Sequence, residues 1–251
     1  MEYIRKHYPA LLIIIIAVII WEALVRITET PVWILPSPSQ IAVAFADNNK
    51  IIFYHALITL AESLLGFTLA IIFAILLAIL IDNIQFLKKG FYPILVASQT
   101  IPIIAIAPLL TIWFGFGILP KIFVVVLVAF FPIVVSLIDG LNSTDQGLIS
   151  LLETMNASKW QIFFKIRFPS ALPSFFSGLR IAATYSVMGA VIMEWLGASK
   201  GLGNYMKNTS HSFQTAQNFA AVIVVIGVSI LLYSLLMLLE SKIIPWNKKN
   251  N

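Results

Sequence analysis

The sequence predicts an all-α integral membrane protein, and its composition and the placement of its few charges are the reasons. Of its 251 residues, 60% are hydrophobic and 11% are charged, whereas soluble domains average about 25% charged residues. The charges are too few to coat a soluble globule. A soluble enzyme, a DNA-binding domain and a disordered chain are therefore excluded. The absence of cysteine excludes a disulfide framework, a thiolate metal site and a cysteine nucleophile.

The first of six predicted transmembrane helices covers residues 9–25. Arg5 and Lys6 precede this apolar run, as in a signal peptide. No small-residue cleavage site follows, because the next residues are Arg26-Ile-Thr-Glu29. We therefore expect a retained helix.

Five further spans follow from the apolar runs, because a helix needs about 20 apolar residues to cross a bilayer. The second run covers residues 56–81, the fifth 171–198 and the sixth 219–239. Residues 91–138 contain a single charge, Lys121, and are too long for one span. We expect two spans there, separated at Gly115-Phe-Gly117 and Pro120, since glycine and proline punctuate helices.

Lysine and arginine predict the orientation, because cytoplasmic loops carry an excess of them. With the N-terminus inside, ten lie on the cytoplasmic side: Arg5, Lys6, Lys88, Lys89, Lys159, Lys165, Arg167, Lys242, Lys248 and Lys249. Five lie outside: Arg26, Lys50, Lys121, Lys200 and Lys207. We therefore expect a multi-pass protein of a bacterial cell membrane, with both termini cytoplasmic. The net charge of +5 is a topology signal of this kind, so the expected surroundings are a lipid bilayer and no nucleic acid.

The loops predict a division of the chain into three parts. Residues 26–55 form a long, polar, proline-containing segment on the outside, so the first helix stands apart. We expect an N-terminal helix and external segment over residues 1–54, a transmembrane domain over 55–242 and a cytoplasmic tail over 243–251. No clear internal repeat is present.

The longest cytoplasmic loop, residues 143–169, predicts two short helices joined by a tight turn. Ser143-Thr-Asp-Gln146 and Ser158-Lys-Trp-Gln161 both have the capping-box form. Asn156 tolerates a left-handed helix end, and Pro169 is expected to end the second helix. An apolar face follows at helical spacing, formed by Leu148, Leu151, Leu152 and Met155. Trp160, Phe163, Phe164 and Arg167 are expected to share a face of the second helix. Chemistry alone leaves two roles open, a docking element for another protein and an amphipathic loop on the bilayer surface.

The same loop resembles the coupling loop of bacterial ABC importer permeases of the type I family. That pattern runs Glu-Ala-Ala, three residues, Gly, nine residues, Ile-x-Leu-Pro. Here its positions hold Ser150-Leu-Leu152, Asn156 and Ile166-Arg-Phe-Pro169, so the spacing, Ile166 and Pro169 are kept, while the Glu-Ala-Ala start is lost. The resemblance implies a loop that contacts an ATPase through Leu151, Leu152, Glu153, Met155, Asn156, Ala157, Ser158, Lys159, Ile166 and Pro169.

Other segments extend the resemblance over nearly the whole chain. Ile34-Leu-Pro-Ser-Pro-Ser39, residues 101–117 and residues 172–182 are similar to the nitrate, sulfonate and taurine branch of the family. Residues 183–203 look most like permeases for the pyrimidine precursor of thiamine. The resemblance implies a homodimer, two cytoplasmic ATPase subunits that hold ATP and Mg, and an extracytoplasmic solute-binding protein. No cofactor is expected in this chain. A permease for nitrate, sulfonate, taurine or riboflavin remains an alternative.

Charges at membrane depth usually line a cavity or pair with one another. The candidates for a translocation path or gate are Glu62, Arg180, Thr184, Tyr185, Met188 and Glu194. Helix packing is the competing interpretation, because small residues surround these positions and allow close approach: Gly178, Ala182, Ala183, Gly189 and Ala190. For Arg180 we favour structural pairing or gating over contact with the solute.

Two other classes of protein are considered. A vitamin-binding membrane subunit of an energy-coupling-factor transporter lacks the long cytoplasmic hairpin predicted here. An intramembrane enzyme needs a paired-carboxylate, Ser/His or metal constellation, and Asp82 and Asp139 are both expected at cytoplasmic helix ends. No phosphate-binding loop is present. We therefore expect no catalytic residues and no metal site in this chain, with ATP hydrolysis on a partner.

Overall fold

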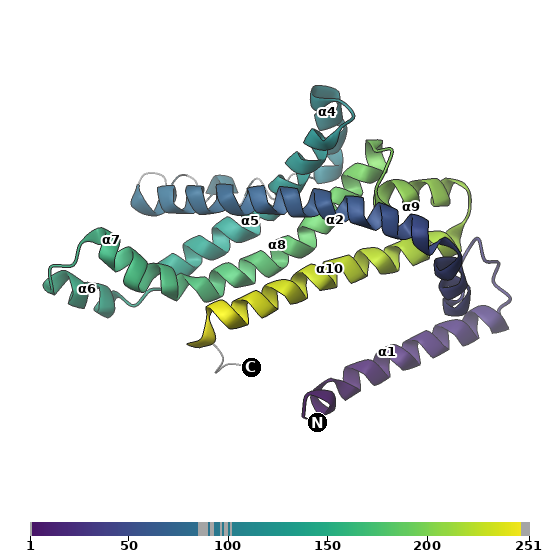
Figure 1. The fold of residues 1–251 in the computed structure, drawn as a ribbon, viewed down its shortest axis with the longest axis horizontal. Coiled ribbons are helices and arrows are strands. Elements are labelled where there is room, and N and C mark those ends of the chain that lie inside the picture. Colours follow the sequence, from purple (N-terminus) through teal and green to yellow (C-terminus); the bar gives the residue numbers. More distant parts are fainter. Residues whose placement is uncertain are drawn as a thin grey trace.

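The computed structural model describes residues 2–84, 90, 93–95, 97, 100 and 102–246, and every regular element among them is helical (Figure 1). This confirms the predicted all-α class. The topology lysines Lys88, Lys89, Lys248 and Lys249 lie outside the described residues. The elements are α1 (Glu2–Ile27), α2 (Pro38–Asn83), α4 (Ile103–Phe114), α5 (Ile118–Asn142), α6 (Gln146–Thr154), α7 (Lys159–Ile162), the π-helical turn η1 (Phe163–Arg167), α8 (Phe168–Gly197), α9 (Leu202–His211) and α10 (Thr215–Ile243).

Four described segments are long and apolar enough to cross a membrane. They cover residues 38–82, 118–142, 159–197 and 215–243, which contain the predicted second, fourth and sixth spans and all but the last residue of the fifth. The third expected span corresponds to α4, an apolar helix of 12 residues, and the first to α1, a helix of 26 residues. The predicted total of six spans is therefore not confirmed. The predicted break at Gly115-Phe-Gly117 is confirmed, because α4 ends at Phe114 and α5 begins at Ile118.

Much of the segment expected to be external, residues 26–55, is helical, a feature that was not predicted from the sequence. The helix α2 begins at Pro38 and continues for 46 residues, about 69 Å at the usual rise. Ser37 starts it with a capping box: its hydroxyl accepts from the Gln40 amide, and the Gln40 side chain accepts from the Ser37 amide at 2.8 Å. Ile41 and Ile52 are buried in a cluster with Leu202 and Tyr205 of α9. Burial of these apolar side chains stabilises the part of α2 that precedes the apolar run of residues 56–81.

The central bundle consists of α2, α5, α8 and α10, and its core joins Phe67, Leu137, Leu179 and Leu232, one from each helix. The most extensive contact in the described part of the bundle is between α5 and α8. A Cβ added at Gly178 would lie 2.6 Å from the Pro132 carbonyl oxygen, and one added at Gly140 would lie 2.9 Å from the Ala171 carbonyl oxygen. Gly178 of α8 and Gly140 of α5 thus allow the two helices to pack closely, which agrees with the packing interpretation of the small residues near Arg180.

The first helix stands apart from this bundle, as predicted (Figure 1). Its C-terminal part is attached through Trp21, whose ring lies 5.8 Å from that of Phe219. The Glu22 carboxylate accepts from the Ser39 amide at 2.9 Å and so occupies the N-terminus of α2. Figure 1 shows α6 and α7 at one end of the bundle and α9 at the opposite end.

Candidate functional site

The predicted two-helix loop is present, and we call α6, α7, the turn between them and η1, which continues α7, the hairpin. Asn156 has a φ of 59°, the left-handed conformation expected at a helix end. The predicted capping box of the second helix is confirmed: the Ser158 amide donates to the Gln161 side chain at 2.7 Å, and the Gln161 amide donates to the Ser158 hydroxyl at 3.3 Å. These local interactions fix the turn without help from the bundle.

The capping box predicted for the first helix is wrong. The N-cap of α6 is Asp145, whose carboxylate accepts from the Gly147 amide at 2.7 Å. The Ser143 hydroxyl instead donates to the Gly140 carbonyl oxygen at 2.9 Å. The reason is the length of α5, which continues to Asn142, so that Ser143 satisfies a carbonyl of its last turn.

Pro169 was expected to end the second helix, and this prediction is also wrong. The chain stays helical from Lys159 to Gly197 because η1 precedes the proline. The Phe168 amide donates to the Phe163 carbonyl oxygen, five residues back, so the turn before Pro169 is wider than an α-turn. Pro169 then lies in the first turn of α8, where its missing N–H costs least.

The hairpin exposes apolar side chains that no described residue covers. None of the residues of α6 is buried, and the exposed fractions of Leu151 and Met155 are 57% and 70%. The Trp160 and Phe164 rings stack 5.7 Å apart and are also exposed. Among the other residues assigned to the coupling contact, Glu153, Ser158 and Lys159 are exposed, and Leu152, Ala157, Ile166 and Pro169 are half-buried. An uncovered face of this kind is expected to bind a partner.

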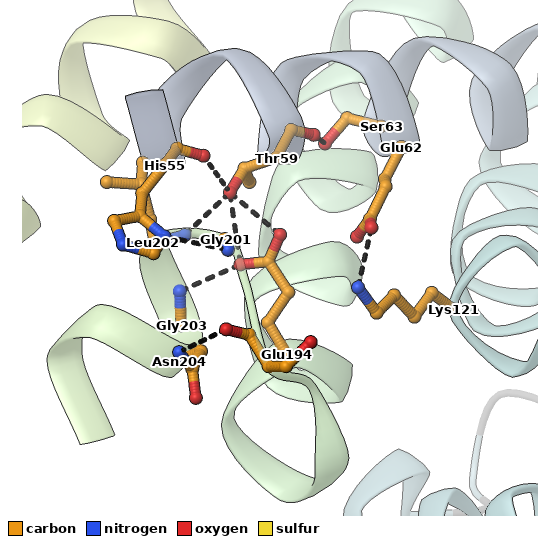
Figure 2. Close-up of polar contacts among 11 residues, drawn as sticks. His55, Thr59, Glu62, Ser63, Lys121, Glu194, Gly201, Leu202, Gly203 and Asn204 are labelled. Atoms are coloured by element: carbon orange, nitrogen blue, oxygen red, sulfur yellow. Dashed lines mark hydrogen bonds and ion pairs between the residues drawn. The ribbon is translucent and has the colours of Figure 1, made fainter. Parts of the chain in front are cut away.

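A second group of polar residues lies buried at the opposite end of the bundle, around Glu194 (Figure 2). Glu194 is fully buried, and its carboxylate accepts from the Thr59 hydroxyl at 2.8 Å and from the Gly203 amide at 2.7 Å. The Leu202 amide donates to the same Thr59 hydroxyl at 2.8 Å. The carboxylate therefore occupies the N-terminus of α9, where the amides and the helix dipole favour an anion. It ties α8, α2 and α9 together.

Two glycines make room for this carboxylate. Gly201 has a φ of +103°, and a Cβ there would lie 2.1 Å from the Glu194 carboxyl group. A Cβ at Gly203 would lie 2.2 Å from the Val191 carbonyl oxygen. The Gly201 amide donates to the His55 Nδ1 atom at 3.0 Å, which adds a second link from this turn to α2. Gly201-Leu-Gly203 is therefore a backbone cradle for a carboxylate.

Glu62 and Lys121 form a buried ion pair between α2 and α5, beside this group (Figure 2). The Lys121 Nζ atom lies 2.5 Å from the Glu62 Oε1 atom, and the two side chains are 12% and 7% exposed. The sequence had placed Lys121 among the external topology charges and left Glu62 without a partner. The signal that pointed to the pair was the cost of a lone carboxylate in an apolar run.

We predict that this ion pair contributes to stability chiefly as a pair. Lys121→Met leaves the Glu62 carboxylate buried without its partner and should lower the free energy of unfolding by about 3–5 kcal/mol. The double variant Glu62→Leu with Lys121→Met should recover most of this loss, because two apolar side chains often replace a buried ion pair without a net cost. Thermal unfolding in detergent measures both variants, with Lys50→Met at an exposed site of α2 as the matched control. Equal midpoints for Lys121→Met and Lys50→Met would contradict the prediction.

The remaining candidates divide into a paired residue and an exposed face. Arg180 pairs with Glu240 of α10 and also donates to the Ser177 hydroxyl at 3.1 Å, which agrees with the structural pairing that we favoured. Thr184, Tyr185 and Met188 share an exposed face of α8, away from the bundle core. The Thr184 hydroxyl donates to the Arg180 carbonyl oxygen at 3.3 Å, within the same helix, and none of the three side chains hydrogen-bonds to the side chain of Glu62, Arg180 or Glu194 in the described part of the chain. In the described part of the chain, no three His, Asp or Glu side chains are grouped as a metal site requires.

The comparison with known proteins agrees with this architecture. The chain is 40% identical to the formylaminopyrimidine transport permease protein ThiX of Halalkalibacterium halodurans, over 98% of this chain and 99% of that protein. It is 38% identical to a probable ABC transporter permease protein of Haemophilus influenzae, over 89% and 91%, and 34% identical to the riboflavin transport system permease protein RibX of Chloroflexus aurantiacus, over 96% and 92%.

A solved structure supports the fold. The MetNI methionine ABC transporter, in inward-facing conformations, has a chain that matches with a TM-score of 0.56 over 78% of this chain and 94% of that one, at 20% identity. Residues 66–247 match the family model described as binding-protein-dependent transport system inner membrane component. The chain therefore belongs to the family of binding-protein-dependent ABC importer permeases of the inner membrane.

Proposed function

We propose that this permease imports a pyrimidine precursor of thiamine, as a homodimer with two cytoplasmic ATPase subunits and an extracytoplasmic solute-binding protein. The observation that carries the proposal is the 40% identity, over almost the full length, to a formylaminopyrimidine permease. The similarity between residues 183–203 and permeases for such precursors points the same way. ATP and Mg would be held by the partner ATPases.

The hairpin is the part that we assign to energy coupling. Its exposed apolar face and its projecting position fit a contact with the ATPase subunits. Closure of the ATPase pair would move the hairpin and bias the bundle between inward-open and outward-open states. In this arrangement both termini are cytoplasmic, and the α9 end faces the solute-binding protein.

The exposed face of α8 is our candidate for the translocation path. Thr184, Tyr185 and Met188 lie on it, and two copies of this chain would bring two such faces together. The buried residues Glu62, Arg180 and Glu194 would set the geometry of the bundle around the path, since each is engaged with another side chain.

The substrate is tested with the reconstituted transporter. The permease, its ATPase and its solute-binding protein are placed in proteoliposomes, and uptake of formylaminopyrimidine is compared with that of riboflavin and taurine. We expect uptake of the pyrimidine to require both ATP and the binding protein and to exceed the others by more than about tenfold. A hydrolysis-deficient ATPase is the control. Riboflavin uptake without pyrimidine uptake would reject the proposal in favour of the second candidate, a riboflavin permease, which the 34% identity to RibX supports.

A further inference from the structure

Arg167 forms a bidentate ion pair with Asp82 at the base of the hairpin. Its Nη1 atom donates to the Asp82 Oδ2 atom at 2.6 Å and its Nη2 atom donates to the Asp82 Oδ1 atom at 2.7 Å. The Asp82 side chain is 7% exposed and that of Arg167 is 23% exposed. A parallel pair of this kind is stronger and more directional than a single contact.

The contact joins three helices at one point. Asp82 is the penultimate residue of α2, and Arg167 is the last residue of η1, directly before α8. The Arg167 Nη2 atom also lies 3.4 Å from the Leu141 carbonyl oxygen, in the last turn of α5. The C-terminal ends of α2 and α5 both carry partial negative charge, so one guanidinium stabilises both, and a lone Asp82 would be unfavourable there.

Direct packing between the hairpin and α2 is sparse. No residue of α6 is buried. A cavity of about 470 Å³ lies between the hairpin and the end of α2, lined by Ile79 and Asp82 on one side and by Ile149, Lys159 and Phe163 on the other. The ion pair lies at the edge of this cavity, where contact between the hairpin and α2 is otherwise sparse.

The backbone on the hairpin side of Arg167 is the π-helical turn. Such turns occur mostly as single turns inside α-helices, often at functional sites. The Arg167 Nε atom is buried without a hydrogen-bond partner in the described residues, so the guanidinium is held by the Asp82 carboxylate and the Leu141 carbonyl oxygen and not by its own helix. The position of the side chain thus depends on α2 as much as on η1.

We propose that Arg167 and Asp82 are positioning residues for energy coupling, the contact through which a displacement of the hairpin is transmitted to α2. The inference rests on the coupling role proposed for the hairpin. It explains why α2 and α8, which meet again at Thr59 and Glu194, would move together: they are joined by a polar contact at each end of the bundle.

The test compares the solute transported per ATP hydrolysed in the reconstituted transporter. Arg167→Lys keeps the charge but not the bidentate geometry. We expect the ATPase subunits still to copurify and to hydrolyse ATP, while the transported solute per ATP falls by about fivefold or more. Asp82→Asn should give the same loss, and Asp82→Arg with Arg167→Asp should regain part of it. Arg26→Lys, at the exposed pair with Glu22, is the matched control and should keep the wild-type ratio.

The outcomes separate this inference from the proposed function. If the wild-type complex shows no ATP-driven uptake, the proposed function is rejected and this inference with it. If the wild type transports and Arg167→Lys and Asp82→Asn keep its ratio, this inference alone is overturned. A loss of thermal stability in both variants with an unchanged ratio in the assembled fraction shows a purely structural role and also overturns it.

Discussion

Replacing Gly201 by alanine should be among the most destabilising single changes in this protein. The glycine has a φ of +103° and a ψ of 164°, a conformation that is essentially restricted to glycine. The added Cβ would lie 2.1 Å from the Glu194 carboxyl group, which is fully buried and has no room to withdraw. Backbone strain and overpacking together predict a loss of about 2–5 kcal/mol.

The measurement is the thermal unfolding midpoint of the purified protein in detergent. Gly227→Ala is the matched control, because a Cβ at that position in α10 meets nothing within 4 Å. We expect this control to be unchanged or slightly stabilised, since alanine suits a helix better than glycine. If Gly201→Ala unfolds at the same temperature as Gly227→Ala, the cradle assigned to residues 201–203 is wrong.

The largest effect on transport is expected from a proline in α6. Leu151→Pro removes a backbone donor and places a ring against the preceding turn, at a cost of about 3 kcal/mol or more to the helix. Because no residue of α6 is buried, the damage should stay local and the protein should still insert and keep its unfolding midpoint. ATP-driven uptake should fall by more than about tenfold. Hydrolysis should continue where the ATPase subunits still bind the permease, and stimulation by the permease should be lost where they no longer bind.

The control is a proline in the same helix where the geometry accepts it. Gln146 is the first residue of α6, and the capping bond of Asp145 uses the Gly147 amide, so Gln146→Pro should leave uptake near that of the wild type. Ala157→Glu tests the same surface without disturbing a helix, and we expect a similar loss. Full uptake by Leu151→Pro and Ala157→Glu would refute the coupling role of the hairpin.

The parts of the fold that follow from local chemistry could be predicted from the sequence. The capping box at Ser158, the left-handed Asn156 and the break at Gly115-Phe-Gly117 each depend on residues within one or two turns. Pro169 was predicted wrongly, because the helix continues through an unusual π-helical turn that no local pattern announces. The start of α2 was missed although the Ser37–Gln40 capping box marks it in the sequence, because it lies outside the apolar runs from which the spans were predicted.

The candidate site divides in the same way. Glu62, Arg180 and Glu194 stood out because a carboxylate or guanidinium in an apolar run needs a partner. The partners themselves were missed, since Thr59 and Glu194 are 135 residues apart and Lys121 and Glu62 are 59 residues apart. Such pairings depend on how the helices are arranged, and a single sequence gives no direct signal of them.

The first turns of α2, around Ile41 and Ile52, can fold only late during synthesis of the chain. Ile41 and Ile52 are translated early, but the residues that cover them, among them Leu202, Tyr205 and Ala220, come from α9 and the start of α10. Until those late segments leave the ribosome, this amphipathic stretch lacks most of the residues that bury its apolar side, and only early ones such as Trp21 are available. The start of α2 therefore reaches its packed state only when nearly all of the protein has been made. A nascent chain that stops before α9 would leave this apolar surface exposed to chaperones and proteases.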